Sequence, residues 1–393
     1  MSESVKKVVV YYTHTFFLDA TLETIQSFKE DVILHLVIEV TPQSQKSTVL
    51  DIPTLDGLNS IEPAFKVMGA SQWDKFKSYF NGLASVHFVV YNQQRALSIP
   101  TFKVAYATGK WISQLNPDII HFDTFSLRAI GMYPYFRNWD SFITIHDPMP
   151  HSGEGSWKDF FLKKIYFSLA KGLFFYSNFS KQQFVEHHPI VKTKRHILTL
   201  QPYTFIQQFT NELGLNKGSY ILFFGRISPY KGIDLFLEAI PFVLKKYPNE
   251  TFVIAGKSDT YKIDHLLVAP YSDNIRFIED YLIIDELASL ISAAKFIVCP
   301  YRDATQSGVL MTAMSLGKMS VVTSVGAFPE YIQDNVNGLL VAPNTNDIAE
   351  AILYALEENR YELLQENVQR NYSDVVGANN QKAILAAYDI AFV

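Results

Sequence analysis

Residues 219–240 read SYILFFGRISPYKGIDLFLEAI, and this stretch decides the fold of its half of the chain. Consecutive apolar residues before Gly225 predict a buried parallel strand, because a strand covered on both faces is apolar at every position. Gly225 permits a tight turn, and apolar residues three and four apart after the turn predict a helix. Arg226 and Lys231 therefore lie at a junction between a strand and a helix.

Short β-branched runs alternate with helical patterns along the whole chain. The first half contains runs such as KKVVVYYT, DIIHFD and FITIHD, and a second series of runs begins near residue 218. The segments between the runs are long enough for crossover helices, so both series predict parallel sheets. We expect an α/β protein with two doubly wound, Rossmann-like domains that face a cleft.

The polar segment QQFTNELGLNKGS marks the boundary between these domains. A length of 393 residues suits two domains better than one. We expect an N-terminal Rossmann-like domain over residues 1–206 and a C-terminal one over residues 207–377. Residues 378–393 form a last helical segment, for which packing back on the first domain is one arrangement that the composition leaves open.

The composition is that of a packed globular protein and argues against several classes of function. Hydrophobic residues make up 48% of the chain, which is too many for a disordered protein. The net charge of −5 argues against a general nucleic-acid binder, which needs excess Lys and Arg to neutralise phosphates. Cys299 is the single cysteine and is interpreted as a small buried hydrophobe. Without a disulfide, a signal peptide or a membrane-spanning run, we expect a cytoplasmic protein.

A second junction between strand and helix occurs in PYRDATQSGVLMTAMSLGK, residues 300–318. Thr305, Gln306, Ser307 and Gly308 would bring backbone N–H groups toward the cleft, and Val309 opens a helix whose N-terminus favours anions. The arginine of the first junction offers a planar fork of donors and the lysine a compact charge, a combination that suits a diphosphate. Because ligands bind beyond the carboxyl ends of parallel strands, the two junctions predict one nucleotide-diphosphate site. The alternative is a solvated turn and a polar loop before a core helix.

Together these segments resemble a retaining glycosyltransferase of the GT-B fold, similar to glycosyltransferase family 4. The resemblance rests on FFGRISPYKGIDLFLEAI, on the loop and helix beginning DATQSG, and on NGLLVAPNTNDIAEAI. It covers the whole second domain and, more loosely, the first. It implies that the second domain binds a sugar nucleotide and the first a saccharide or lipid-linked acceptor. The sugar nucleotide is a co-substrate, and we expect neither a cofactor nor a metal, because cations and a helix dipole can stabilise the leaving diphosphate.

The resemblance assigns roles to individual residues of the second domain. Arg226 and Lys231 would hold the donor diphosphate, and Tyr281 falls where the family places the nucleotide base. Thr312 and Ala304 stand where the family usually carries two glutamates, of which the one at 312 grips the ribose. A threonine offers only one weaker hydroxyl contact. The missing carboxylates leave open a rival interpretation, a non-catalytic or attenuated sugar-nucleotide-binding subunit.

The first domain contributes ITIHDPMPHSGEGS, residues 143–156. His146 follows a predicted strand where the family commonly places a histidine near the donor sugar, so we predict a catalytic or sugar-positioning role. Asp147 would orient it. The alternative is a histidine that caps a loop. His151 and Glu154 extend the cluster, but the spacing fits no zinc pattern, so we predict no metal site.

Two other enzyme classes fit the sequence less well than this resemblance does. A sugar-nucleotide epimerase can share this architecture, although we find no convincing set of carboxylates around the sugar. A nicotinamide-dependent dehydrogenase matches poorly, because no GxGxxG follows the first strand.

Residues 157–181 mix aromatic side chains with lysines, which is typical either of peripheral membrane contact or of an amphipathic crossover helix followed by a buried strand. We favour the crossover helix.

Overall fold

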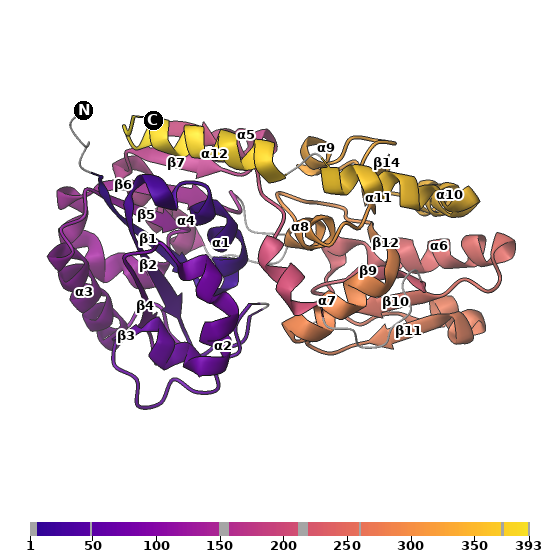
Figure 1. The fold of residues 1–393 in the computed structure, drawn as a ribbon, viewed down its shortest axis with the longest axis horizontal. Helices are drawn as coiled ribbons and strands as arrows, with labels where there is room; N and C mark the ends of the chain where they lie inside the picture. Colours follow the sequence, from indigo (N-terminus) through magenta and orange to yellow (C-terminus); the bar gives the residue numbers. More distant parts are fainter. Residues whose placement is uncertain are drawn as a thin grey trace. The chain divides into compact units, whose positions relative to one another are not determined.

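The chain forms two compact units in the computed structural model, which describes residues 6–47, 49–148, 157–210, 219–258, 261–370 and 373–391. Unit 1 comprises Met1–Thr199 with Val376–Val393, and unit 2 comprises Leu200–Val375. Each unit contains one sheet, and helices accompany both sheets in Figure 1. The α/β architecture predicted from the alternating pattern is confirmed.

Unit 1 contains an eight-stranded sheet in the order β3-β4-β2-β1-β5-β6-β7-β8. All neighbouring strands are parallel except β3 and β4. The strands are β1 (Val8–His14), β2 (Ile33–Val40), β3 (Ile61–Pro63), β4 (Ser85–Val90), β5 (Ile119–Asp123), β6 (Asp140–Ile145), β7 (Gly172–Phe175) and β8 (Lys194–Ile197). From β1 the chain first adds β2, β4 and the edge strand β3 on one side and then β5 to β8 on the other, so the topological switch lies between β1 and β5. In such sheets ligands bind beyond the carboxyl ends of the strands at this switch.

The helices of unit 1 cover a sheet whose central strands are buried on both faces. Every residue of β5 and of β7 is buried, as the uninterrupted apolar runs predict. The helical elements are η1 (Thr15–Phe17), α1 (Leu18–Gln26), η2 (Lys29–Asp31), α2 (Ala64–Phe80), α3 (Ile99–Gln114), η3 (Leu127–Asn138), α4 (Trp157–Leu169), α5 (Asn178–His187) and α12 (Ser373–Ala387). The side chain of Ser98 accepts a hydrogen bond from the N–H of Thr101, which caps the start of α3.

Helix α12 packs on unit 1 although it follows the strands of unit 2 in the sequence (Figure 1). The side-chain amide of Asn380 bonds both backbone groups of Thr199, at 2.9 and 2.8 Å. The hydroxyl of Tyr388, just beyond the helix, lies 2.5 Å from Nδ1 of His121 in β5. The other ring nitrogen of His121 lies 2.7 Å from the hydroxyl of Thr144. The end of the chain is thus hydrogen-bonded into the first sheet.

Tyr388→Phe is expected to lower the free energy of unfolding by about 1–3 kcal/mol, because it leaves the buried Nδ1 of His121 without this partner. The measurement is the midpoint of urea denaturation. Gln381→Ala is the matched control on the same helix, since it removes a 2.9 Å bond to Asp31 that is only partly buried. An equal loss in the two variants would contradict a structural role for the Tyr388 hydroxyl.

Unit 2 contains a six-stranded sheet, entirely parallel, in the order β11-β10-β9-β12-β13-β14. The strands are β9 (Tyr220–Phe224), β10 (Phe252–Ala255), β11 (Ile275–Ile278), β12 (Ala294–Cys299), β13 (Ser320–Thr323) and β14 (Gly338–Val341). The helical elements are η4 (Thr204–Phe209), η5 (Pro229–Lys231), α6 (Ile233–Lys246), η6 (His265–Asn274), α7 (Ile284–Ala293), α8 (Gly308–Ser315), α9 (Phe328–Tyr331), α10 (Thr345–Leu356), η7 (Glu357–Asn359) and α11 (Arg360–Arg370). Strands β9 and β12 are neighbours, so the two junctions that follow them share one edge of the sheet.

Candidate functional site

The two junctions of unit 2 meet at Gly225, directly after β9. A Cβ atom added to Gly225 would lie 2.8 Å from Cγ2 of Val309 in α8 and 3.6 Å from Nζ of Lys231. The φ angle of Gly225 is +110°, a conformation that residues with a side chain rarely adopt. Glycine at this position therefore lets the lysine of the first junction approach the helix of the second.

Lys231 is a buried cation at this meeting point, with only 7% of its surface exposed. Its Nζ lies 2.5 Å from the hydroxyl of Tyr301 and 4.3 Å from the centroid of the same ring. Burial lowers the pKa of Lys231 to about 8, and the positive charge of Arg226 acts in the same direction. Among the residues that the structure describes, no carboxylate forms an ion pair with Lys231. A buried cation beside a second cation is stabilised by a bound anion.

The second junction supplies backbone donors to the same place. Ser307 caps α8, and its side chain accepts the N–H of Leu310 at 3.2 Å. The N–H groups of Gly308 and Val309, in the first turn, have no acceptor within the helix. The N-terminus of α8 thus presents donors and the positive end of its dipole next to Lys231.

Gly225→Ala is expected to weaken binding of a nucleotide diphosphate by at least about tenfold, because the new methyl group must displace Val309 at the start of α8. Binding is measured by isothermal titration. Gly57→Ala is a matched control, since Gly57 has a φ of +74° but no atom within 4 Å of an added Cβ. If both variants bind as the parent does, the contact at Gly225 does not shape the site.

Two buried residues, Ala304 and Thr312, stand where the family usually carries glutamates. The hydroxyl of Thr312 donates to the carbonyl of Gly308 at 2.7 Å, so it already bonds its own helix. Ala304 is buried, and its carbonyl accepts the N–H of Ala327 at 2.8 Å. Tyr281 is partly exposed in the loop between β11 and α7. Contact of Thr312 or Tyr281 with a nucleotide stays a prediction.

The candidate site of unit 1 is built on His146, which follows β6. Nε2 of His146 lies 2.9 Å from Oδ1 of Asp123, the last residue of β5, and both side chains are buried. The imidazole stacks on the ring of Phe17, with 4.0 Å between centroids. The hydroxyls of Thr21 and Thr13 donate to the other carboxylate oxygen of Asp123. The pair therefore lies at the carboxyl ends of the neighbouring strands β5 and β6. Thr13 of β1 and Thr21 of α1 hold the carboxylate of Asp123 in place.

The charge state of His146 is set by opposing effects. Burial is the largest effect and would lower the pKa of His146, but the hydrogen bond and charge of Asp123, with the charges of Asp147 and Asp19, together outweigh it, and the pKa is raised. Asp147, which was predicted to orient the ring, is exposed, and its charge also raises the pKa of His146. Asp123 was missed by sequence reasoning. The signal was available in DIIHFD, because this run ends in a carboxylate and precedes the strand that leads to His146.

The described part of the chain shows no group of three or more His, Cys, Asp and Glu residues placed to hold a metal ion. His151 and Glu154 lie outside the described residues. No helix in the described ranges is both long and apolar enough to cross a lipid bilayer.

Comparison with known sequences shows what the second unit is similar to. Residues 218–358 match the family model described as Glycosyl transferases group 1. The chain is 33% identical over 148 residues to an uncharacterized glycosyltransferase of Methanocaldococcus jannaschii, covering 36% of this chain and 40% of that protein. It is 28% identical over 181 residues to a phosphatidyl-myo-inositol mannosyltransferase of Mycobacterium tuberculosis, covering 45% of each chain. The chain therefore spans less than half the length of these relatives.

Solved structures extend the likeness to the whole fold. A glycosyltransferase from Rickettsia africae superposes with a TM-score of 0.65 at 15% identity, covering 98% of both chains. The Anabaena protein HepE, crystallised with UDP and glucose, gives a TM-score of 0.65 at 13% identity, covering 97% of this chain and all of that one. The chain therefore has the GT-B fold, and residues 218–358 of its second unit are similar to the glycosyl transferases group 1 family.

Proposed function

We propose that this chain is a retaining glycosyltransferase that moves a hexose-like sugar from a nucleotide diphosphate to an acceptor without a metal. The observation that carries this proposal is the meeting of Lys231, Arg226 and the N-terminus of α8 around Gly225. Two cationic side chains and a helix N-terminus form a site for a diphosphate. The similarity to a mannosyltransferase and to HepE, which binds UDP, supports a sugar-nucleotide donor.

The proposed chemistry uses these groups on the leaving phosphate. When the bond between the anomeric carbon and the diphosphate breaks, positive charge develops on the sugar and negative charge on the phosphate. Lys231, Arg226 and the first N–H groups of α8 are fixed before the reaction and stabilise the phosphate as its charge grows. This set of positive groups takes the place that a divalent cation has in other transferases.

Unit 1 is proposed to bind the acceptor, a saccharide or a lipid-linked molecule. Its polar groups gather at the carboxyl edge of the sheet, where His146 and Asp123 follow adjacent strands. We assign sugar positioning to His146 and orientation of the imidazole to Asp123. The threonine hydroxyls that bond Asp123 hold the carboxylate in place.

A second candidate function is binding of a sugar nucleotide without transfer. It is favoured by the buried Ala304 and by the Thr312 hydroxyl, which already bonds its own helix, at the two positions where the family usually carries carboxylates. The two functions share the diphosphate site and differ in turnover.

The test uses the purified full-length chain and a panel of sugar nucleotides that differ in base and sugar. A ligand that binds only the folded state raises the melting temperature, so the true donor is expected to do so. The donor is then incubated with candidate acceptors, with and without EDTA, and the anomeric configuration of the product is determined by NMR. A donor that stabilises the protein but is never turned over favours the binding subunit, and an epimerised donor favours the epimerase. If no sugar nucleotide stabilises the protein, the proposed site is wrong.

A further inference from the structure

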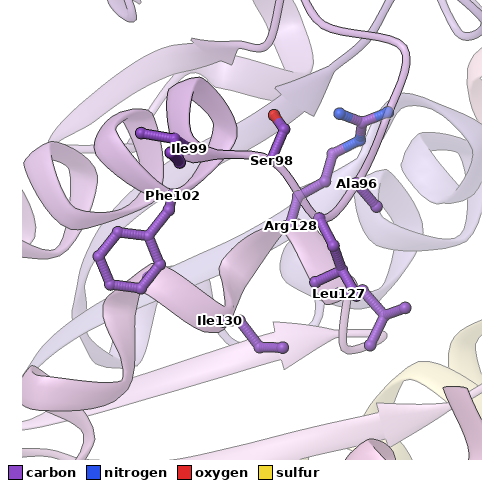
Figure 2. Close-up of a pocket in the computed structure, with 9 residues that line it drawn as sticks. Ala96, Ser98, Ile99, Phe102, Leu127, Arg128 and Ile130 are labelled. Carbon is purple, nitrogen blue, oxygen red and sulfur yellow. The ribbon is translucent and has the colours of Figure 1, made fainter. Parts of the chain in front are cut away.

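Unit 1 contains a hollow of about 370 Å³ between the loop after β4, the start of α3 and the start of η3 (Figure 2). A volume of this size lies within the range of small-molecule sites. The side chains around it are mainly apolar: Ala96, Leu97, Ile99, Phe102, Leu127 and Ile130. None of the residues that line the hollow is among those assigned above to the donor or to the surroundings of His146.

The walls of the hollow are held by specific contacts. The guanidinium of Arg128 donates to the carbonyls of Gln93 and Gln94, at 2.7 and 2.6 Å. Its charged end therefore supports the loop, and in Figure 2 it points away from the hollow. Gly131 lets η3 approach α3, since an added Cβ would lie 2.5 Å from the carbonyl oxygen of Phe102.

Large apolar side chains around the hollow are exposed. Ile99 is 75% exposed and Phe102 is 47% exposed, and Tyr106 follows on the same face of α3 at a spacing of four. Leu97 in the preceding loop and Tyr133 in η3 are exposed as well. The outer face of a helix on a sheet is normally polar. A contiguous exposed apolar patch indicates an interaction surface.

The two segments that form the walls of this patch carry charge of one sign, although Asp118, Asp123 and Asp140 lie directly beyond their ends. Residues 91–117 and 124–139, which form its walls, contain no Asp or Glu although the whole chain has a net charge of −5. The basic residues of these two segments are Arg95, Lys103, Lys110, Arg128 and Arg137, and all except Arg128 are exposed. Exposed apolar residues with basic neighbours in the same segments complement a layer that has an apolar core and anionic groups at its surface.

We propose that this patch, formed by the loop at 95–98, the outer face of α3 and the start of η3, docks on an anionic lipid bilayer. Ile99 and Phe102 enter the acyl region, and the hollow takes up part of an acyl chain. Tyr106 and Tyr133 lie at the level of the headgroups, where aromatic rings with a polar end are favoured. The lysine stems extend along the apolar surface and place their ammonium groups at the lipid phosphates.

This surface differs from residues 157–181, the segment for which the sequence left peripheral membrane contact open. In residues 157–181 the aromatic side chains of Tyr166, Phe167 and Phe174 are buried in the core of unit 1. They pack inside the protein and are not available to a membrane. Among the side chains that the structure describes, α4 exposes only Ile165 and Leu169, whereas the larger set of exposed apolar side chains with basic neighbours lies on α3 and the loop before it.

The test is flotation of the purified full-length protein with phosphatidylcholine vesicles, with and without phosphatidylglycerol. We expect binding to the anionic vesicles that weakens as salt is added. Ile99→Ser with Phe102→Ser should abolish flotation. Lys103→Glu with Lys110→Glu should lower the partition coefficient by at least about tenfold, since each basic residue near an anionic surface contributes about fivefold.

Matched controls change equally exposed residues of unit 1 outside the patch. Ile190→Ser and the pair Lys192→Glu with Lys194→Glu should float as the parent does. Failure of the parent to bind anionic vesicles, or full binding by the patch variants, would overturn the proposal. Self-association that is lost in the Ile99 and Phe102 variant, without vesicle binding, would also overturn it and assign the patch to a second copy. No sugar nucleotide is present, so this test and the test of the proposed function fail separately.

Discussion

Lys231→Met is expected to abolish the rise in melting temperature caused by the sugar-nucleotide donor and to lower sugar transfer by about 10²- to 10³-fold. The reason is that Lys231 is a fixed charge at the meeting point of the two junctions, where the proposed mechanism places the negative charge that grows on the leaving phosphate. Lys245→Met is the matched control, because Lys245 is an exposed lysine on α6 of the same unit. A Lys231→Met protein that still responds to the donor as the parent does would refute the placement of the diphosphate.

The same substitution is expected to leave the ligand-free protein as stable as the parent, or more stable. Burial lowers the pKa of Lys231 from 10.5 to about 8, so between these values the unfolded chain binds more protons than the folded one. The free energy of unfolding therefore rises with pH in this window, and below about pH 8 the charged lysine costs stability. Methionine removes that cost, which separates loss of binding from loss of fold.

The pH dependence of donor binding follows from the same pKa. Above pH 8 the free protein carries a neutral Lys231, whereas the bound diphosphate favours the charged form. Binding at higher pH must therefore take up a proton, and affinity falls by up to about tenfold per pH unit. Titration calorimetry in two buffers with different ionisation enthalpies detects this proton, and Lys231→Met should show none.

His146→Ala is expected to lower turnover by about 10²-fold while the donor still raises the melting temperature. In the proposed function His146 positions the reacting sugar, and small displacements of a reacting group slow a reaction strongly. We expect donor binding to be retained, because the proposed diphosphate contacts belong to unit 2. A variant that loses donor binding and turnover together would place His146 in a structural role.

Asp123→Asn is expected to reproduce much of the turnover loss through His146. The amide keeps the shape of the carboxylate but removes the charge that raises the pKa of His146, so burial then lowers that pKa. NMR titration of the imidazole reports the shift, and the pH profile of turnover should move with it. Asp147→Asn is the control, because Asp147 is exposed. If Asp147→Asn has the larger effect on both measurements, then Asp147 orients the ring.

The pair of His146 and Asp123 makes the free energy of unfolding fall as the pH rises, whereas Lys231 makes it rise. Because the pKa of His146 is raised above 6.5 in the folded protein, the charged pair stabilises the fold fully below that value. The contribution is lost as the pH rises through the folded pKa. Urea midpoints measured across this range should lose the dependence in Asp123→Asn.

The sequence alone determined the elements and the chemistry at the ends of two strands. The apolar run before Gly225 and the periodicity after it are local properties, and they predicted β9 and α6. Arg226 and Lys231 could be singled out for the same reason, since a strand end followed by a helix places charges at a known edge of a sheet. Short-range patterns carry this information because backbone geometry repeats every two or 3.6 residues.

Only the tertiary structure decided which of these groups meet. Asp123 reaches His146 because β5 and β6 are neighbours, and Gly225 reaches Val309 because β9 and β12 are neighbours. Tyr388 bonds His121 across 267 residues of sequence. The exposed apolar face of α3 likewise became visible only when packing showed which side of the helix the core covers. Such contacts depend on strand order and on which face is buried, and neither is encoded in a local run of residues.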